Sequence, residues 1–366
     1  MAVPVDNTTG YSYQFQNFGK TSNRGIELSV NVDVINKGDF RFNVGAIYNY
    51  NRNKLDELPN ADQYLYSSYW GSSSLVPTND YMFVEGKAIG LVRGFISEGY
   101  YTVDDFNYTN GQYVLKEGVP DITKALTATY MHPYDLPAGQ TAFPGAAKFR
   151  DVDESGTVDL DDATCLGEVM PRHTGSFQLN FNYKNFDLST NFNWTAGGKV
   201  YNVAAMINAS GQEFDGIGAQ RASWVADAFK VYNVNAAGDL YAVTNPDELR
   251  ALNANAKYHL PYHQSGITSS EWLENGSYLR LQTLTLGYTL PKNWLTKVHV
   301  DKIRLYLTAT NLFTITGYSG IDPEVNANPT GQSGFYSDLR IFPTLNMDFG
   351  TYPRARTFTF GANITF

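Results

Sequence analysis

The sequence Thr357-Phe-Thr-Phe-Gly-Ala-Asn-Ile-Thr-Phe366 ends the chain and alternates strictly between polar and apolar residues. Successive residues of a β-strand point to opposite faces. The phenylalanines, the alanine and the isoleucine therefore fall on one face of an extended chain, and the threonines, the glycine and the asparagine fall on the other. A strand of this kind suits the edge of a soluble sandwich or the wall of a membrane barrel. The pattern in the rest of the chain is needed to decide between these two folds.

The same alternation is found along much of the chain. Residues 25–34 and 39–51 predict a long hairpin, with Gly38 supplying the backbone angle of the turn. Residues 176–194 predict a second hairpin, whose two-residue turn at Lys184 and Asn185 fixes an antiparallel register. Further strands are expected at residues 90–101, 278–290 and 303–311. A helix carrying Trp224 is expected within residues 213–233.

Composition limits the protein class. The chain has 366 residues, of which only 17% are charged, and it is rich in Tyr (26), Phe (22) and Gly (32). Soluble domains carry roughly 25% charged residues, and aromatic residues favour strands. The net charge of −9 and the absence of a basic run argue against a nucleic-acid partner. The single Cys165 excludes an intramolecular disulfide framework.

Loop lengths favour the membrane barrel. Turns between the paired strands are short, whereas residues 52–81, 104–145, 197–275 and 317–355 form long connections. Short turns at one end and long loops at the other are typical of outer-membrane barrels. No run of about 18 apolar residues predicts a transmembrane helix. The first residues lack a signal peptide, so we expect an outer-membrane location with the signal lost by truncation.

The two strand faces suggest different surroundings. Glu27, Asp33, Arg41 and Asp187 lie on the polar side of their strands and are expected to line a wet interior, while the aromatic and aliphatic side is expected to face lipid. The alternative is a surface or soluble β-sandwich that binds carbohydrate and calcium without transport. In that case the same apolar face would cover a core.

Several segments together resemble the SusC/RagA-type TonB-dependent outer-membrane transporters of Bacteroidetes. The resemblance extends over nearly the whole chain, in matching order and spacing, and includes the terminal Phe366. The segments are residues 17–28 (NFGKTSNRGIEL), 148–159 (KFRDVDESGTVD), 171–175 (PRHTG), 183–189 (YKNFDLS), 276–291 (GSYLRLQTLTLGYTLP), 309–313 (ATNLF) and 320–324 (GIDPE).

This resemblance implies an all-β fold, part of an antiparallel transmembrane barrel of about 22 strands around a plug. About eight to ten strands are expected here, so residues 1–366 would be a C-terminal barrel fragment without the plug domain. The implied function is energised import of a glycan or peptide nutrient across the outer membrane, with no enzymatic step. The implied partners are a SusD-like lipoprotein and, through the missing plug, the TonB complex.

The most specific local motif is an acidic loop that follows the spacing of an EF-hand calcium loop. Its glycine, Gly156, occupies the position of the sharp turn. An aspartate replaces the usual bidentate glutamate at the end, and no helix clearly flanks the loop. We expect a structural Ca²⁺ that stiffens a long loop, and the alternative is a solvated acidic turn. The expected ligands are Asp151, Asp153, Ser155, the Thr157 carbonyl, Asp159 and Asp162.

Aromatic residues in the expected loops suggest platforms that stack on a sugar ring or a peptide side chain. Those singled out are Tyr66, Tyr69, Trp70 and Trp272, with packing inside the loops as the alternative. His259 and His263 have a metal-like spacing, but Pro261 would break the helix needed to bring them together. They are expected to be surface histidines. No nucleophile, phosphate-binding or dinucleotide motif is present.

Overall fold

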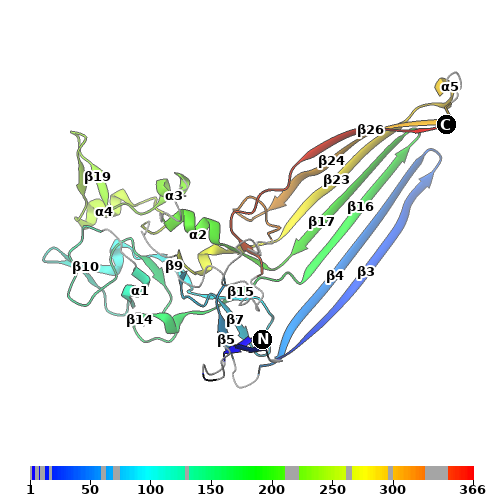
Figure 1. The fold of residues 1–366 in the computed structure, drawn as a ribbon. Coiled ribbons are helices and arrows are strands. Elements are labelled where there is room, and N and C mark those ends of the chain that lie inside the picture. The colour runs from blue at the N-terminus through cyan, green and yellow to red at the C-terminus, as the bar shows by residue number, and fades with distance from the viewer. Residues whose placement is uncertain are drawn as a thin grey trace.

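Seven long strands form one curved antiparallel sheet, which confirms the expected fold class (Figure 1). The structure is a computed structural model that describes residues 2–4, 8, 13–15, 19–58, 63–68, 75–127, 132–210, 222–260, 266–295, 300–325 and 345–366. Adjacent strands follow the order β26-β24-β23-β17-β16-β4-β3. Their bounds are β3 (Lys20–Lys37), β4 (Phe40–Glu57), β16 (His173–Tyr183), β17 (Phe186–Ala196), β23 (Tyr278–Thr289), β24 (Lys302–Thr316) and β26 (Thr357–Thr365).

The register keeps like residues on the same face across the sheet. Directly opposed residues in an antiparallel pair share a face. On one face Val30 is opposite Ala46, and Ala46 is opposite Phe177. On the other face Asn43 is opposite Asn180, which is opposite Ser189. We call these the apolar face and the polar face.

The apolar face is uncovered in the described part of the chain. Ile26 is 61% exposed and Phe360 is 74% exposed, although both are large hydrophobic residues. Gly175 lets the Trp194 ring lie close to Tyr48, because an added Cβ would lie 2.8 Å from that indole and 2.3 Å from the Ile47 carbonyl oxygen. A sandwich would cover this face with a second sheet. An uncovered apolar face of this length instead suits contact with lipid.

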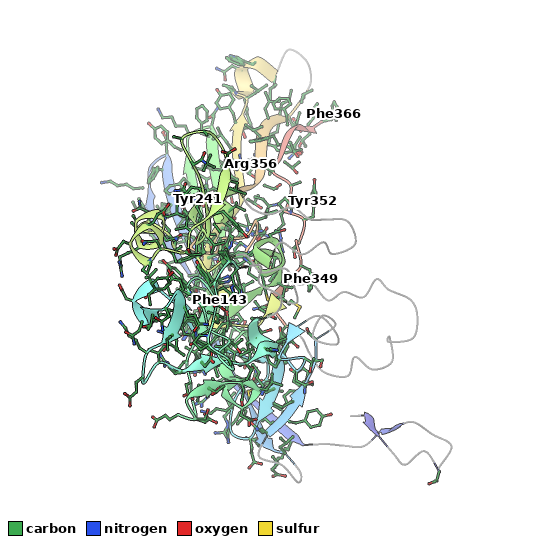
Figure 2. All side chains as sticks on the ribbon, turned by 90° about the vertical axis from the view of Figure 1, so that its left-hand side faces the viewer. Phe143, Tyr241, Phe349, Tyr352, Arg356 and Phe366 are labelled. Atoms are coloured by element: carbon green, nitrogen blue, oxygen red, sulfur yellow. The ribbon has the colours of Figure 1, made fainter. Side chains whose placement is uncertain are left out.

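The two ends of the sheet differ as the loop lengths predicted. Tight turns after β3 and β16 lie at one end, the turn end, together with the β23–β24 connection and the C-terminus (Figure 1). That connection includes α5 (Lys292–Leu295). Phe366, 86% exposed, projects outward at this end (Figure 2). The three long connections leave the opposite end, the loop end.

These three connections, residues 58–172, 197–277 and 317–356 as far as they are described, fold together into what we call the loop module. Its strands are short and belong to several small sheets. They are β5 (Gln63–Tyr66), β6 (Leu75–Val76), β7 (Tyr81–Val84), β8 (Leu91–Gly94), β9 (Ser97–Tyr100), β10 (Phe106–Thr109), β11 (Gln112–Leu115), β12 (Asp121–Ile122), β13 (Ala147–Phe149), β14 (Thr157–Val158), β15 (Thr164–Glu168), β18 (Lys199–Asn202), β19 (Tyr232–Val234), β20 (Leu240–Ala242), β21 (Gly266–Ile267), β22 (Leu273–Asn275) and β25 (Met347–Asp348).

Helices in the loop module are also short. They are α1 (Lys124–Thr127), α2 (Val203–Ser210), α3 (Ala222–Asp227) and α4 (Pro246–Leu252), with 3-10 turns η2 (Val103–Asp105), η3 (Leu160–Asp162) and η4 (Ser270–Trp272). Trp224 lies on α3 as expected, whereas the strand expected at residues 90–101 is divided into β8 and β9 and lies outside the large sheet. A separate hairpin pairs β1 (Ala2–Pro4) with β2 (Tyr13–Phe15). Among the described residues, no helix has both the length and the apolar character needed to cross a bilayer.

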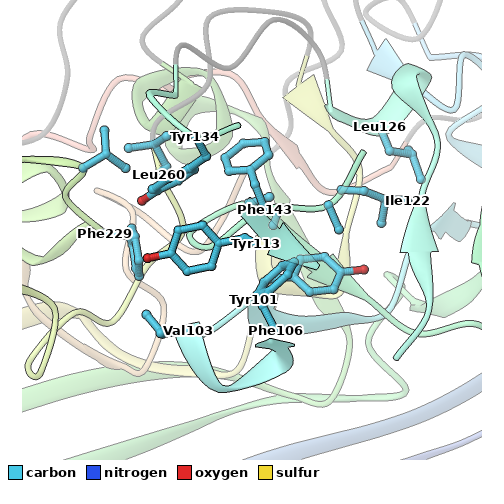
Figure 3. Close-up of a cluster of buried hydrophobic side chains, with 14 of the residues drawn as sticks. Tyr101, Val103, Phe106, Tyr113, Ile122, Leu126, Tyr134, Phe143, Phe229 and Leu260 are labelled. Carbon is cyan, nitrogen blue, oxygen red and sulfur yellow. The ribbon is translucent and has the colours of Figure 1, made fainter. Parts of the chain in front are cut away.

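Two large hydrophobic cores and one small cluster, formed by Val200, Tyr318 and Val325, hold the loop module together. The first is rich in aromatic rings, including Tyr101, Tyr113 and Phe143 (Figure 3). Two of its buried phenols donate to distant carbonyl groups: Tyr113 Oη to the Thr244 oxygen at 2.8 Å and Tyr101 Oη to the Pro120 oxygen at 2.6 Å. The second core contains Tyr66, Tyr81, Trp224 and Trp272, among others. The sequence predicted loops here, and the structure instead shows a packed body.

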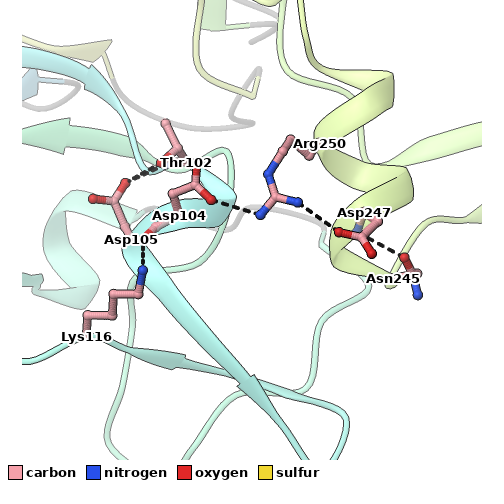
Figure 4. Close-up of polar contacts among 7 residues, drawn as sticks. All are labelled: Thr102, Asp104, Asp105, Lys116, Asn245, Asp247 and Arg250. Atoms are coloured by element: carbon pink, nitrogen blue, oxygen red, sulfur yellow. Dashed lines mark hydrogen bonds and ion pairs between the residues drawn. The ribbon is translucent and has the colours of Figure 1, made fainter.

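Ion pairs connect neighbouring elements on the surface of the loop module. The Arg250 guanidinium on α4 donates to Asp247 on its own helix at 2.9 Å and to Asp104 of η2 at 2.8 Å (Figure 4). Asn245 caps the same helix by accepting from the backbone N–H groups of Asp247 and Glu248. Arg250 and Asp104 are at least half exposed, so their pairing is worth less than about 1 kcal/mol.

Candidate functional site

The polar face of the sheet carries a continuous set of side-chain hydrogen bonds. Asn43 donates to Asn31 and Asp33 on β3, and Asn180 donates to Asn43 from β16. Ser189 on β17 then donates to Asn180 at 2.7 Å. The two-residue alternation of each strand places these polar residues on the same face. The result is a hydrogen-bonded polar wall, as expected for a surface that faces water.

An ion pair on this wall lies near the turn end. Arg304 on β24 donates through Nε and Nη2 to both oxygens of Asp187 on β17, at 2.9 and 2.5 Å. The pair spans β23 at Gly287, where an added Cβ would lie 2.4 Å from Asp187 and 2.5 Å from Arg304. The glycine therefore leaves room for the two side chains to meet above β23. Of the four residues expected to line a wet interior, Asp33 and Asp187 take part in these polar contacts.

The acidic loop brings three of its expected ligands together. One oxygen each from Asp151, Asp153 and Asp162 lies within 4.8 Å of the others. Asp162 is fully buried and accepts from the backbone N–H groups of Val152 at 2.6 Å and Asp159 at 2.8 Å. Three carboxylates at this spacing repel one another unless a cation or N–H donors compensate. The arrangement suits a hard divalent cation.

Other expected ligands of the acidic loop are engaged elsewhere. The Ser155 hydroxyl donates to the Thr157 carbonyl oxygen at 3.0 Å, so the two expected ligands bond to each other. The Asp159 carboxylate accepts from the Asp161 N–H at 2.8 Å and caps η3. Asp159 therefore does not join the three converging carboxylates. Hydrogen bonding by Ser155, whose backbone N–H donates to Asp153 at 3.0 Å, lowers the pKa of Asp153, the most exposed of those three acids.

Two of the four expected aromatic platforms are buried. Tyr66 is 5% exposed and packs on Phe83 with ring centroids 4.7 Å apart. Trp272 is 4% exposed and lies 5.3 Å from the Trp224 ring. Their burial favours packing over ligand stacking for these two rings. Tyr69 and Trp70 lie outside the described residues.

His259 is buried, so its interpretation as a surface histidine was wrong. Its Nδ1 lies 2.8 Å from the Leu260 carbonyl oxygen, and its Nε2 lies 4.0 Å from the carboxylate of Glu271. Burial lowers the pKa of His259 to about 4 and raises the pKa of Glu271 to about 7. His263 lies outside the described residues. The sequence offered no signal for Glu271, because the pair forms only through the second core.

The sheet and its two faces define a class of protein. The long antiparallel sheet has one uncovered apolar face and one polar face, with short turns at one end and a large loop module at the other. These features identify it as part of a transmembrane β-barrel wall.

Comparison with known proteins agrees with this class. The chain matches no protein-family model. It is 29% identical over 99% of its length to TonB-dependent receptor P3 of Formosa agariphila and 24% identical over its whole length to TonB-dependent receptor SusC of Bacteroides thetaiotaomicron. It covers 30% and 28% of these two proteins, so it spans about three tenths of the curated relatives that it matches.

Solved structures show the same fold. The whole chain superimposes on 31% of a chain in the structure of the RagAB peptide transporter, with a TM-score of 0.63 and 20% identity. A RagAB peptide importer in the closed-closed state gives the same TM-score at 21% identity. The resemblance to SusC/RagA-type TonB-dependent transporters is therefore confirmed. Such receptors are transport proteins and not enzymes, as expected for this chain.

Proposed function

We propose that this chain forms a C-terminal part of the barrel wall of a TonB-dependent importer in the outer membrane. The observation that carries the proposal is the seven-stranded sheet with opposed polar and apolar faces, supported by similarity to such receptors along the whole chain. The polar wall would line the path of the nutrient, and the apolar face would contact lipid. The plug would be supplied by another part of the protein.

The partners follow from the same proposal. A SusD-like lipoprotein would cover the loop module from outside, and the TonB complex would act through the plug. The nutrient would be a glycan or a peptide. Support comes from the similarity of this chain to SusC and to a chain of the RagAB peptide transporter. Those names describe the similar proteins and not this chain.

Membrane placement is tested by introducing single cysteines into the full-length protein, from which all other cysteines have been removed. The variants are assayed in membranes. Val30→Cys lies on the apolar face and Asn31→Cys on the polar face of the same strand. A charged thiol reagent should modify the polar-face cysteine and leave the apolar-face cysteine unmodified. Equal modification of both would contradict the barrel and favour the alternative of a soluble sandwich that binds carbohydrate and calcium.

Nutrient class is tested by uptake in cells that produce the full-length protein with its partners. Cells are offered fluorescent oligosaccharides or fluorescent oligopeptides of similar size. Uptake of one class, abolished by dissipating the proton gradient, would identify the cargo. Uptake of neither would contradict energised nutrient import.

We further propose that the acidic loop binds a structural Ca²⁺ through Asp151, Asp153 and Asp162. The proposal is supported by the convergence of their oxygens within 4.8 Å. Calorimetric titration of the full-length protein with Ca²⁺ tests it, with Asp153→Asn as the variant and Asp161→Asn as the matched control. Loss of one binding event in the first variant alone is expected. Equal titrations of the wild type and both variants would contradict the site.

A further inference from the structure

A short segment after β24 crosses the loop end of the sheet and is fixed at its beginning. The segment is residues 318–325. Tyr318 Oη donates to Asp348 at 2.5 Å, and Ser319 donates to Glu274 through both its backbone N–H and its hydroxyl, at 2.7 Å each. These contacts bind the start of the segment to β25 and β22. Residues 320–325 are therefore anchored at one end, and their position over the sheet depends on the contacts made later in the segment.

Those later contacts involve Arg280 on β23. Its Nη2 lies 2.5 Å from Asp322 Oδ1, and its Nη1 lies 3.4 Å from Glu324 Oε2. Glu324 is also paired with Arg354 at 2.6 Å. The four residues carry two positive and two negative charges, so the cluster is neutral as a whole. It connects the barrel strand, the segment and the chain that leads into β26.

The segment lies over the polar face and not the apolar face. Arg280 is directly opposite Asn193 on β17. Asn193 belongs to the same alternating set as Asp187 and Ser189, which lie on the polar wall. Because Arg280 shares that face, its partner Asp322 must lie over the polar wall at the loop end.

Burial makes the contact between Arg280 and Asp322 a strong constraint. Their side chains are 2% and 8% exposed. Within the described residues, Nε and Nη1 of Arg280 have no hydrogen-bond acceptor, so Asp322 supplies the only short acceptor of this guanidinium that the structure shows. A buried charge that loses its partner is strongly destabilised and moves toward water. Loss of the carboxylate charge should therefore release the part of the segment around Asp322 from the sheet, while Tyr318 and Ser319 keep their contacts with β25 and β22.

We propose that Arg280 and Asp322 form a latch that holds residues 318–325 across the polar wall and narrows the nutrient path at the loop end. The proposal rests on the proposed function, in which the polar wall lines that path. Opening the latch exposes the polar wall beneath it. Arg280 and Asp322 act as positioning residues and need not touch the nutrient.

Cysteine accessibility in the full-length protein in membranes tests the latch. The reporter is Asn193→Cys, in a background with Cys165→Ser and no other cysteine. Asp322→Asn should raise the rate of modification by a charged thiol reagent about ten-fold or more, because the neutral amide no longer holds the guanidinium. Asp322→Glu, which keeps the charge, should restore a slow rate.

A matched control removes a carboxylate charge elsewhere. Asp104→Asn breaks the exposed ion pair with Arg250 and should leave the reporter rate unchanged. If Asp322→Asn reacts within about two-fold of the wild-type rate, or if Asp104→Asn accelerates it equally, the latch is wrong. If Asp322→Asn does not fold, Arg280→Lys gives the same test, since a lysine keeps the charge but loses the forked geometry. A wild-type rate with Arg280→Lys overturns the latch in that case.

Failure of the proposed function has a different signature. Rapid modification of Val30→Cys on the apolar face would show that this face does not contact lipid, whatever the reporter at residue 193 does. The two results are therefore distinguishable.

Discussion

Asp162 should control whether the acidic loop stays folded. Its carboxylate is fully buried and accepts two short bonds from backbone N–H groups, from Val152 at 2.6 Å and Asp159 at 2.8 Å. A third bond from Asp153 is longer, at 3.3 Å. Asp162→Ala leaves these backbone donors without their acceptor. Hydrogen bonds to a charged group are worth about 1.5–3 kcal/mol each, so the two short bonds give a loss of roughly 3–6 kcal/mol.

This loss is measured by limited proteolysis of the full-length protein in the presence of a calcium chelator. When local opening is fast relative to cleavage, the cleavage rate follows the population of the open loop. About 1.4 kcal/mol is a factor of ten, so cleavage within residues 150–163 should accelerate about a hundred-fold or more. The control is Asp161→Ala, which removes an exposed neighbouring carboxylate. If both variants are cleaved at the same rate, the hydrogen bonds to Asp162 do not hold the loop.

Three further outcomes are expected. Gly175→Ala should lower the stability of the folded barrel by about 1–3 kcal/mol, because the added Cβ would lie too close to the Trp194 indole and the Ile47 carbonyl oxygen. Gly45→Ala is the control and should not lower it, since its added Cβ would lie 3.9 Å from the nearest neighbour. Heat-modifiable migration measures both variants, and equal migration temperatures would contradict the packing. Glu271→Gln should remove a pH-dependent loss of stability. Burial raises the pKa of Glu271 in the folded state from 4.5 to about 7. The contribution of protonated Glu271 to the free energy of unfolding is therefore fully present below pH 4.5 and is lost as the pH rises to about 7, by at most about 3 kcal/mol. Denaturant unfolding followed by tryptophan fluorescence across that pH range measures the loss, and an identical pH profile in the variant would refute it. Phe360→Arg, on the apolar face, should reduce assembly into membranes through a cost of about 2–4 kcal/mol, while Thr359→Arg on the polar face should be tolerated; equal amounts of assembled protein would argue against lipid contact.

Local pattern was enough to predict the large sheet. Residues 25–34 and 176–194 alternate cleanly because each strand has one polar and one apolar face, and their short turns fix which strands pair. The loop module could not be predicted in this way. Tyr81 Oη donates to the Leu345 carbonyl oxygen, and Tyr113 Oη to that of Thr244. Contacts between residues so distant in sequence leave no local period.

The acidic loop was predictable in spacing but not in detail. Asp151, Asp153 and Asp162 converge as the motif requires. Asp159 does not, because its carboxylate satisfies the free N–H of Asp161 at the start of a 3-10 turn. Local hydrogen bonding to the backbone competes with metal binding for short acidic side chains. The spacing alone does not show which of these two uses an aspartate takes.

The small strand β25 has a consequence for the order of assembly. Met347 and Asp348 pair with β18, and Met347 belongs to the second core of the loop module. They precede β26 closely in the chain, although the other strands of that core were synthesised much earlier. Such long-range contacts make folding slow, because the chain must close large loops before they form. Completion of the second core and pairing of β26 with the sheet therefore depend on the same short stretch of polypeptide, so neither forms before residues 347–365 are available to fold.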